Sequence, residues 1–507
     1  MIWLNKIQIG EKEYLDKVYA CWLGKNIGGT LGAPYETKKS VNCIDYYDPI
    51  PDKAAPNDDL DLQLIWLKML EEVGISPSLN DFAEYWRRYA IAYPWNEYGF
   101  LGRNLKRGLM PPITGCFENY YLDEMGSPIR SEIWACVAPG DPQLAASMAW
   151  KDAVLDHAGG EGMHGEMFWA AVESAAFVLT DPKILIQIGL SMIPLHTMTS
   201  RVVREALWCF ENGLSWTEAR ERILTYYGHN SPCHAPQNLG FTVLGWLYGK
   251  DFGDKLCIAV NCGYDTDCTA ATLGATLGIL NGTEVIPQKW RSPIGEDIVL
   301  HLFTRKGRME NVPKTINELT KRTFNIAKQF LQEKSEIAIF KEKTLLPENA
   351  LSLLFRNEKA LKALQLDTQA GVSMAGDLEV TLHYSGEPVI RPNIDKMVGI
   401  SLKVKDHEID ADVILEVPKG WEVKTIKKGL DQKSFLLHAS EIQDSNLIGV
   451  CVSLPDKQQC RTKFIILGPN AARGYPSGIN IARPSFKGSE EDWFRKIGAS
   501  KKSKIEN

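Results

Sequence analysis

The 507-residue chain lacks several features that define common classes of protein. No apolar run approaches the roughly 18 residues of a membrane-spanning helix, so we expect no membrane segment. The 11 cysteines include no C-x-x-C pair, which favours buried, reduced thiols. There is no excess of basic residues, and a net charge of −6 argues against a nucleic-acid partner. The first residues do not form a signal peptide, so we expect a cytoplasmic location.

What the sequence contains is a long helical region followed by a shorter region of strands. Residues 1–365 carry apolar side chains at three- and four-residue spacing, which predicts an all-helical domain without an α/β sheet. Residues 366–480 contain short alternating segments, which predict an immunoglobulin-like β-sandwich. Residues 481–507 form a polar tail. The predicted fold class is therefore mainly α, with a small appended β-sandwich domain.

Two acidic clusters, about two hundred residues apart, stand at the starts of predicted helices. The first contains Asn57, Asp58 and Asp59, and the second contains Asp265 and Asp267. Packed carboxylates repel one another, so they coexist when they are solvated or when a cation holds them. The alternative is that Asn57 caps its helix and that the aspartates interact with the helix dipole. If the fold brings both helix starts together, the clusters form an oxygen-rich pocket for a hard divalent cation.

Three motifs, in order along the chain, resemble those of the ADP-ribosylglycohydrolase family. Residues 24–36 (GKNIGGTLGAPYE) resemble its glycine-rich helix and loop, and residues 57–59 resemble its Thr-Asp-Asp motif. Residues 263–268 (GYDTDC) resemble its Gly-Gly-Asp-Thr-Asp-Thr motif. The resemblance covers about residues 14–290, within a helical domain that extends to about 365. It implies an all-helical enzyme that binds magnesium-type ions in a central cleft and hydrolyses an N- or O-glycosidic bond.

The resemblance also implies roles for individual residues. The metal ligands would be Asn57, Asp58, Asp59, Asp265 and Asp267, and they would hold one or two Mg²⁺ or Mn²⁺ ions. Asp58 and Asp267 would take part in catalysis. Glu36 matches a glutamate near the family's cleft and would be a third catalytic residue, acting as a base or positioning the substrate. The alternative for Glu36 is an ordinary loop glutamate.

The chain departs from the family motifs at four positions. Asn57 and Cys268 replace threonines, Gly29 stands where many relatives have aspartate, and Tyr264 replaces a glycine. A neutral thiol is a poor ligand for a hard cation, so a second ion would lose one oxygen at Cys268. Asp61 could compensate with its own carboxylate, or it could face solvent.

Seven further residues are candidates for contact with a substrate: His157, Arg130, Glu132, Tyr264, His234, Asn238 and Trp95. His157 follows Asp156 in a pair that resembles the family's Thr-His pair, although a lone histidine is as often structural. Arg130 and Glu132 could instead pair with each other. His234 and Asn238 border a predicted helix, and Trp95 lies in a predicted loop, where aromatic rings often flank a sugar or base.

Three functions are consistent with these observations. The family activity releases ADP-ribose from a modified protein or small molecule. The second function is hydrolysis of another glycoside or nucleoside, which is favoured by the substituted motif positions and by the predicted sandwich. That sandwich weakly resembles modules of bacterial carbohydrate-active enzymes; alternatively, it is a packing module for the catalytic domain or for a dimer. The third function is sugar or ADP-ribose binding without turnover.

Overall fold

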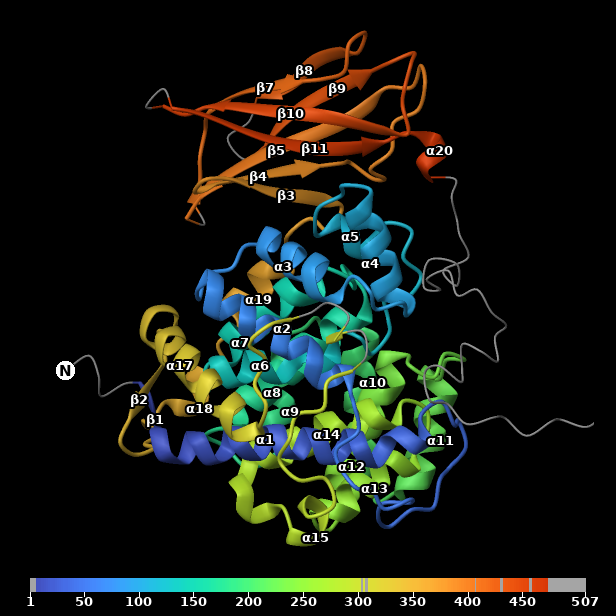
Figure 1. Ribbon diagram of the computed structural model, residues 1–507, viewed down its shortest axis with the longest axis vertical. Helices are drawn as coiled ribbons and strands as arrows, with labels where there is room; N and C mark the ends of the chain where they lie inside the picture. The colour runs from blue at the N-terminus through green and yellow to red at the C-terminus, as the bar shows by residue number, and fades with distance from the viewer. Residues whose placement is uncertain are drawn as a thin grey trace, which may run out of the picture.

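The computed structural model describes residues 6–301, 304–305, 309–405, 407–428, 432–455 and 458–472. Figure 1 shows a helical domain with a separate layer of strands above it, so the predicted fold class is confirmed. The helices are α1 (Glu11–Gly32), α2 (Asp58–Val73), α3 (Leu79–Tyr85), α4 (Asn96–Lys106), α5 (Ile113–Cys116), α6 (Ser131–Val137), α7 (Pro142–Ala153), α8 (Glu161–Ala176), α9 (Pro182–Ser191), α10 (Met198–Glu211), α11 (Trp216–Tyr227), α12 (Ala235–Tyr248), α13 (Phe252–Asn261), α14 (Thr266–Asn281), α15 (Gln288–Arg291), α17 (Ile316–Lys334), α18 (Ala350–Leu354), α19 (Glu358–Ala363) and α20 (Pro469–Ala472). Single turns of 3-10 or π type are η2 (Ala33–Tyr35), η3 (Trp86–Ala90), η4 (Pro128–Arg130) and η5 (Gly282–Val285).

The strands are β1 (Ile7–Gly10), β2 (Ala338–Lys341), β3 (Ala370–Ala375), β4 (Leu378–His383), β5 (Lys396–Val404), β6 (His407–Glu408), β7 (Asp412–Glu416), β8 (Glu422–Lys428), β9 (Lys433–His438), β10 (Ser445–Ser453) and β11 (Gln459–Leu467). The first two were not predicted. They pair in parallel, with Ile7 opposite Ala338, and join the start of the helical domain to the segment after α17. Four-residue strands are too short to show a clear alternation in sequence.

The long helices α1 and α14 pack directly against each other through glycine (Figure 1). Gly24, Gly28 and Gly32 are spaced four residues apart, so they lie on one face of α1. A Cβ atom on Gly28 would lie 1.9 Å from the carbonyl oxygen of Ala270 in α14. One on Gly32 would lie 2.2 Å from that of Thr266, at the start of α14. The contact is antiparallel, and it places the end of α1 beside the first turn of α14.

The C-terminal strands form two sheets that share one hydrophobic core, as predicted for a β-sandwich. One sheet has the order β3-β4-β5-β9-β8, with β6 on β5, and the other has the order β11-β10-β7. In β4 the buried residues Leu378, Val380 and Leu382 alternate with half-buried ones. Phe464 and Ile466 of β11 enter the same core from the opposite sheet. Period-two alternation is what allows each sheet to bury one face.

The sandwich is joined to the helical domain by apolar packing near α5 and β3 (Figure 1). Leu109, Ile113 and Phe117 from the helical domain belong to the hydrophobic core of the sandwich. The backbone N–H of Val372 in β3 also donates to the carbonyl of Pro111, at 2.9 Å. The helical domain therefore completes one end of the sandwich core.

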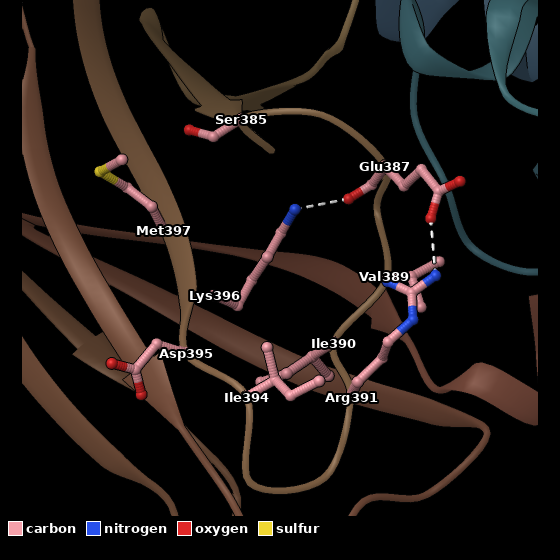
Figure 2. Close-up of a pocket in the computed structure, with 9 residues that line it drawn as sticks. All are labelled: Ser385, Glu387, Val389, Ile390, Arg391, Ile394, Asp395, Lys396 and Met397. Atoms are coloured by element: carbon pink, nitrogen blue, oxygen red, sulfur yellow. Dashed lines mark hydrogen bonds and ion pairs between the residues drawn. The ribbon is translucent and has the colours of Figure 1, made fainter.

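The loop between β4 and β5, with the first residues of β5, lines a hollow of about 280 Å³. Figure 2 shows the side chains that line it. Lys396 Nζ donates to the backbone carbonyl of Glu387 at 2.6 Å, and Arg391 Nη2 donates to the carboxylate of Glu387 at 3.0 Å. Both Lys396 and Arg391 are therefore bonded to Glu387, and Ser385, Glu387 and Arg391 are exposed.

Two expectations from composition can be compared with the structure. No disulfide joins any of the 11 cysteines, all of which lie in the described part of the chain. Most are buried, but Cys43 is exposed, so the expectation of uniformly buried thiols is wrong there. Within the described residues, no helix has both the length and the apolar character needed to cross a membrane.

Candidate metal centre

The first turns of α2 and α14 meet, and this brings the two acidic clusters together. Asn57 caps α2, because its Oδ1 accepts the backbone N–H of Asp59 at 2.8 Å. Asp265 stands immediately before α14, and its N–H donates to Oδ1 of Asn238 at 3.2 Å. Cys268, one turn into α14, lies with Sγ 3.6 Å from Oδ1 of Asp59. Clusters far apart in sequence therefore share one site.

Two groups of ligand atoms share Asp267. Oxygens of Glu36, Asp265 and Asp267 lie within 4.8 Å of one another. The same is true of ligand atoms from Asp59, Asp267 and Cys268. Among the described residues these are the clustered sets that could hold an ion, and Asp267 is common to both. The arrangement offers one all-carboxylate position and one position that contains a thiol.

The electrostatics of the centre fit a divalent cation. Oδ2 of Asp59 and Oδ1 of Asp267 are buried atoms with no hydrogen-bond partner among the described residues. Burial, together with the charge of Asp58, raises the pKa of Asp267 to about 6. Burial and the charges of Asp267 and Glu36 raise the pKa of Asp265 well above its usual range. A cation with oxygen ligands would satisfy these groups, which fits Mg²⁺ or Mn²⁺.

Asp58 and Asp61 are placed differently from each other. Asp58 is the first residue of α2 and is half-buried outside the two ligand groups, although its charge raises the pKa of Asp267. Asp61 is fully buried, and its Oδ2 accepts the backbone N–H of His301 at 2.6 Å. Asp61 therefore neither faces solvent nor joins either group of clustered ligands.

The loop after α1 presents Glu36 to the centre. Glu36 follows η2 and is exposed, and the charge of Asp267 raises its pKa well above the usual range. The next residue, Thr37, donates its N–H to the carbonyl of Tyr264 at 2.8 Å, and Tyr264 donates to the carbonyl of Lys38 at 2.7 Å. This backbone pairing holds Glu36 beside the start of α14.

Tyr264 adopts a conformation that favours glycine. Its φ is 70°, in the left-handed region, which agrees with the glycine that the family motif has at this position. The ring lies 5.7 Å from that of Phe241 and 5.9 Å from the guanidinium of Arg220. Arg220 in turn donates to the carbonyls of Lys39 and Cys262, so it joins the two loops that flank the centre.

A second, fully buried polar cluster contains Arg130 and His157. Arg130 forms a bidentate pair with Asp156 at 2.9 and 3.0 Å and a further pair with Asp152 at 2.8 Å. His157 Nδ1 lies 2.7 Å from Oδ1 of Asp156. His157 Nε2 has no hydrogen-bond partner among the described residues and lies 4.0 Å from Oε1 of Glu97. Asp156 thus orients the imidazole toward Glu97.

Glu97 is a site candidate that the sequence analysis missed. It is 5% exposed, and burial followed by the charge of Glu124 raises its pKa well above the usual range. In sequence it is simply an acidic residue in the first turn of α4, where carboxylates are common. Burial, then the charges of Asp265, Glu124, Glu36 and Glu97, raise the pKa of the Cys233 thiol. Carboxylates of the metal centre and Glu97 thus act on the same thiol.

Arg130 and Glu132 do not form the ion pair considered from the sequence. Arg130 pairs with aspartates, while Glu132 Oε1 accepts a hydrogen bond from Lys25 Nζ at 2.7 Å. Glu132 Oε2 accepts another from Gln63 at 2.8 Å. Both side chains are fully buried. The two residues are only two positions apart, but residues at that spacing do not face each other, and they belong to different charge networks.

The other three candidates lie at the edges of the same region. His234 precedes α12, stacks on His229 at 4.6 Å, and has its pKa lowered to about 4 by burial. Asn238 donates to the carbonyls of Pro232 and His234 while it accepts from Asp265, so it positions the second acidic cluster. Trp95 is half-buried, with its ring 5.4 Å from that of His301.

Comparison with known proteins identifies the family. The model of the ADP-ribosylglycohydrolase family matches residues 10–328, which contain both acidic clusters and Glu97. The chain belongs to the ADP-ribosylglycohydrolase family. A solved structure titled "ADP-ribosylglycohydrolase-related protein complex" is 20% identical, with a TM-score of 0.44, and covers 62% of this chain and 99% of its own. No curated protein gives a significant match. Family membership supports a glycohydrolase type of function.

Proposed function

We propose that this protein is a Mg²⁺- or Mn²⁺-dependent hydrolase that cleaves an N- or O-glycosidic bond and releases ADP-ribose from a modified acceptor. The observation that carries the proposal is Asp267, which is shared by two groups of ligand atoms where the starts of α2 and α14 meet. The family match over residues 10–328 supports the reaction type. The buried Oδ1 of Asp267, which has no hydrogen-bond partner among the described residues, supports the need for a cation.

The roles follow from position. Glu36, Asp265 and Asp267 would hold the ion, with Asp58, Asp59 and Asn57 beside them at the start of α2. When bound, a divalent ion would supply charge stabilisation, orient sugar hydroxyls and lower the pKa of water. Glu36 lies at the exposed edge of the centre, so it is also the group best placed to accept a proton from an attacking water.

His157 and Glu97 would supply the proton that the leaving group takes up. A leaving group departs more easily when an acid protonates it, and an acid that stays protonated near neutral pH is suited to this role. Burial keeps the pKa of Glu97 high, and the imidazole of His157 faces it at 4.0 Å. Tyr264, Trp95 and His234 would border the substrate. Arg130, Glu132 and Asn238 would act through the groups they hold in place.

The proposal is tested with a panel of substrates and a pair of variants. ADP-ribosyl-arginine, ADP-ribosyl-serine, nucleosides and aryl glycosides are incubated with the full-length protein, with and without Mg²⁺ or Mn²⁺. We expect ADP-ribose release only when metal is present. Asp267→Asn should weaken Mn²⁺ binding by more than about 100-fold and abolish turnover. Asp251→Asn, at the cap of the neighbouring helix α13, is the matched control and should leave both unchanged.

The other outcomes separate the alternatives. Metal-dependent cleavage of an aryl glycoside or nucleoside alone would show a glycosidase on the same fold. Absence of turnover on every substrate, together with a melting temperature unaffected by metal, would show a binding protein. Full activity of Asp267→Asn would refute the role of the centre.

A further inference from the structure

A buried lysine lies against one side of the metal centre. Lys25 is in α1 and is 1% exposed. Its Nζ lies 2.7 Å from Oε1 of Glu132 and 4.0 Å from Oδ2 of Asp59. Gln63 fixes this arrangement, because its side chain donates to Glu132 at 2.8 Å and accepts the backbone N–H of Ile133 at 2.7 Å. The ammonium therefore stands at a defined place behind Asp59.

Each carboxylate oxygen of Asp59 therefore faces another side chain. Oδ2 faces the Lys25 ammonium, and Oδ1 lies 3.6 Å from the Cys268 thiol. The group that contains Asp59 thus has a fixed cation on one side and a thiol on the other. All three ligands of the other group, Glu36, Asp265 and Asp267, are oxygen, and no lysine or arginine pairs with them among the described residues. The Cys268 thiol also hydrogen-bonds Asp265, so the difference between the two groups is the ammonium of Lys25.

We propose that this centre binds a single divalent ion, at Glu36, Asp265 and Asp267, and that Lys25 takes the place of a second ion beside Asp59. The inference rests on the proposed metal-dependent function. Metal–oxygen bonds are roughly 2.0–2.6 Å long, so a cation bound to Oδ2 of Asp59 would lie within about 7 Å of the ammonium, and one bound to Oδ1 within about 9 Å. Such a cation would be repelled in a buried site, where charges are poorly screened. A neutral thiol also adds little affinity for a hard ion.

The experiment counts the ions bound to the full-length protein. After removal of metal with a chelator, Mn²⁺ is titrated calorimetrically, and the bound ion is examined by electron paramagnetic resonance. We expect one Mn²⁺ per chain, with the spectrum of an isolated ion. The variant Lys25→Met/Glu132→Gln/Cys268→Thr removes the ammonium and its paired carboxylate and supplies an oxygen ligand. We expect it to bind two ions whose spins are coupled.

Controls keep the result interpretable. Lys17→Met removes another buried lysine from α1, where Nζ donates to the carbonyl of Phe177 at 2.8 Å, and it should still bind one ion. Circular dichroism and the melting temperature establish that each variant is folded. If the triple variant unfolds, Cys268→Thr alone is used, and one ion is still expected because Lys25 remains.

Each other outcome contradicts the inference. Two coupled Mn²⁺ ions in the unaltered protein would overturn it, and so would two ions in Cys268→Thr alone. A second equivalent of Co²⁺ with a sulfur-to-cobalt charge-transfer band would show that Cys268 binds a soft ion beside Asp59. A folded triple variant that retains one ion would refute the role of Lys25. No bound metal in the unaltered protein would instead overturn the proposed function itself.

Discussion

The direct contact between α1 and α14 positions the metal centre, and Gly28→Ala tests this. The new Cβ would lie 1.9 Å from the carbonyl oxygen of Ala270, whereas real Cβ atoms essentially never come within 3.0 Å of another heavy atom. The two backbones would therefore have to separate by roughly 1 Å, since a carbonyl in a packed helix cannot rotate aside. The strain would fall on the contact between α1 and α14, which also includes Gly24 and Gly32, one turn before and one turn after Gly28.

The expected loss of stability is the difference between two opposing contributions to the free energy of unfolding. Overpacking against backbone costs about 3 kcal/mol, the upper end of the usual range, because no side chain can move to relieve it. Replacing glycine by alanine inside a helix returns roughly 1 kcal/mol. The free energy of unfolding should fall by about 2 kcal/mol. Since α14 carries Asp267 in its first turn, Mn²⁺ affinity should also fall, by about 10- to 100-fold.

Urea unfolding followed by tryptophan fluorescence measures the first quantity, and calorimetric Mn²⁺ titration measures the second. Gly102→Ala in α4 is the matched control, because its Cβ would meet only the flexible tip of Ile91, at 3.3 Å. That variant should be as stable as the unaltered protein or slightly more so. If Gly28→Ala matches Gly102→Ala in both measurements, the helix contact does not set the geometry of the centre.

Three further predictions concern other contacts. Burial raises the pKa of Glu161, but the contact with His164 Nδ1 at 3.7 Å and hydrogen bonds from N–H groups at the start of α10 outweigh burial and lower the pKa to about 2. Glu161→Gln should therefore lower the free energy of unfolding at pH 7 by about 2–3 kcal/mol. The difference should shrink as the pH falls from 4.5 toward 2 in urea titrations, and a constant difference would be evidence against it. Arg130→Met leaves three buried carboxylates without their partner and should cost about 3–5 kcal/mol by the same method, a loss that Arg130→Lys should not repair. Asn238→Leu removes the acceptor for the N–H of Asp265 and should weaken Mn²⁺ binding about 10-fold while the protein stays folded; unchanged affinity would remove Asn238 from the centre.

Several features of the site were accessible from residue patterns. Asn57 before an apolar stripe predicts a helix cap, and the structure shows that cap. The glycines of α14 predict close helix packing because glycine has no Cβ, and the structure shows that contact with α1. The alternation in β4 predicts a sheet with one buried face. Each of these inferences depends on contacts within a few residues or on a strict repeat of apolar residues, and both can be read from the sequence alone.

Other features required the folded chain. In the sequence, Glu97 resembles an ordinary carboxylate at the start of a helix. Only the folded chain shows that it is buried opposite His157. Lys25 resembled one of many lysines, and only the packing of α1 put its ammonium 4.0 Å from Asp59. The strands β1 and β2 are too short to be recognised alone, since their pairing joins segments at opposite ends of the helical domain.

By itself, the sequence determined the helical and β regions, the two acidic helix starts and the glycines that permit close contact, because these depend on local preference and periodicity. The tertiary structure alone decided which carboxylates share an ion position, that Asp267 is common to two groups, and that Lys25 and Cys268 flank Asp59. The reason is physical. The interaction of charges depends on their distance and burial, and both quantities exist only after helices from distant parts of the chain have packed together.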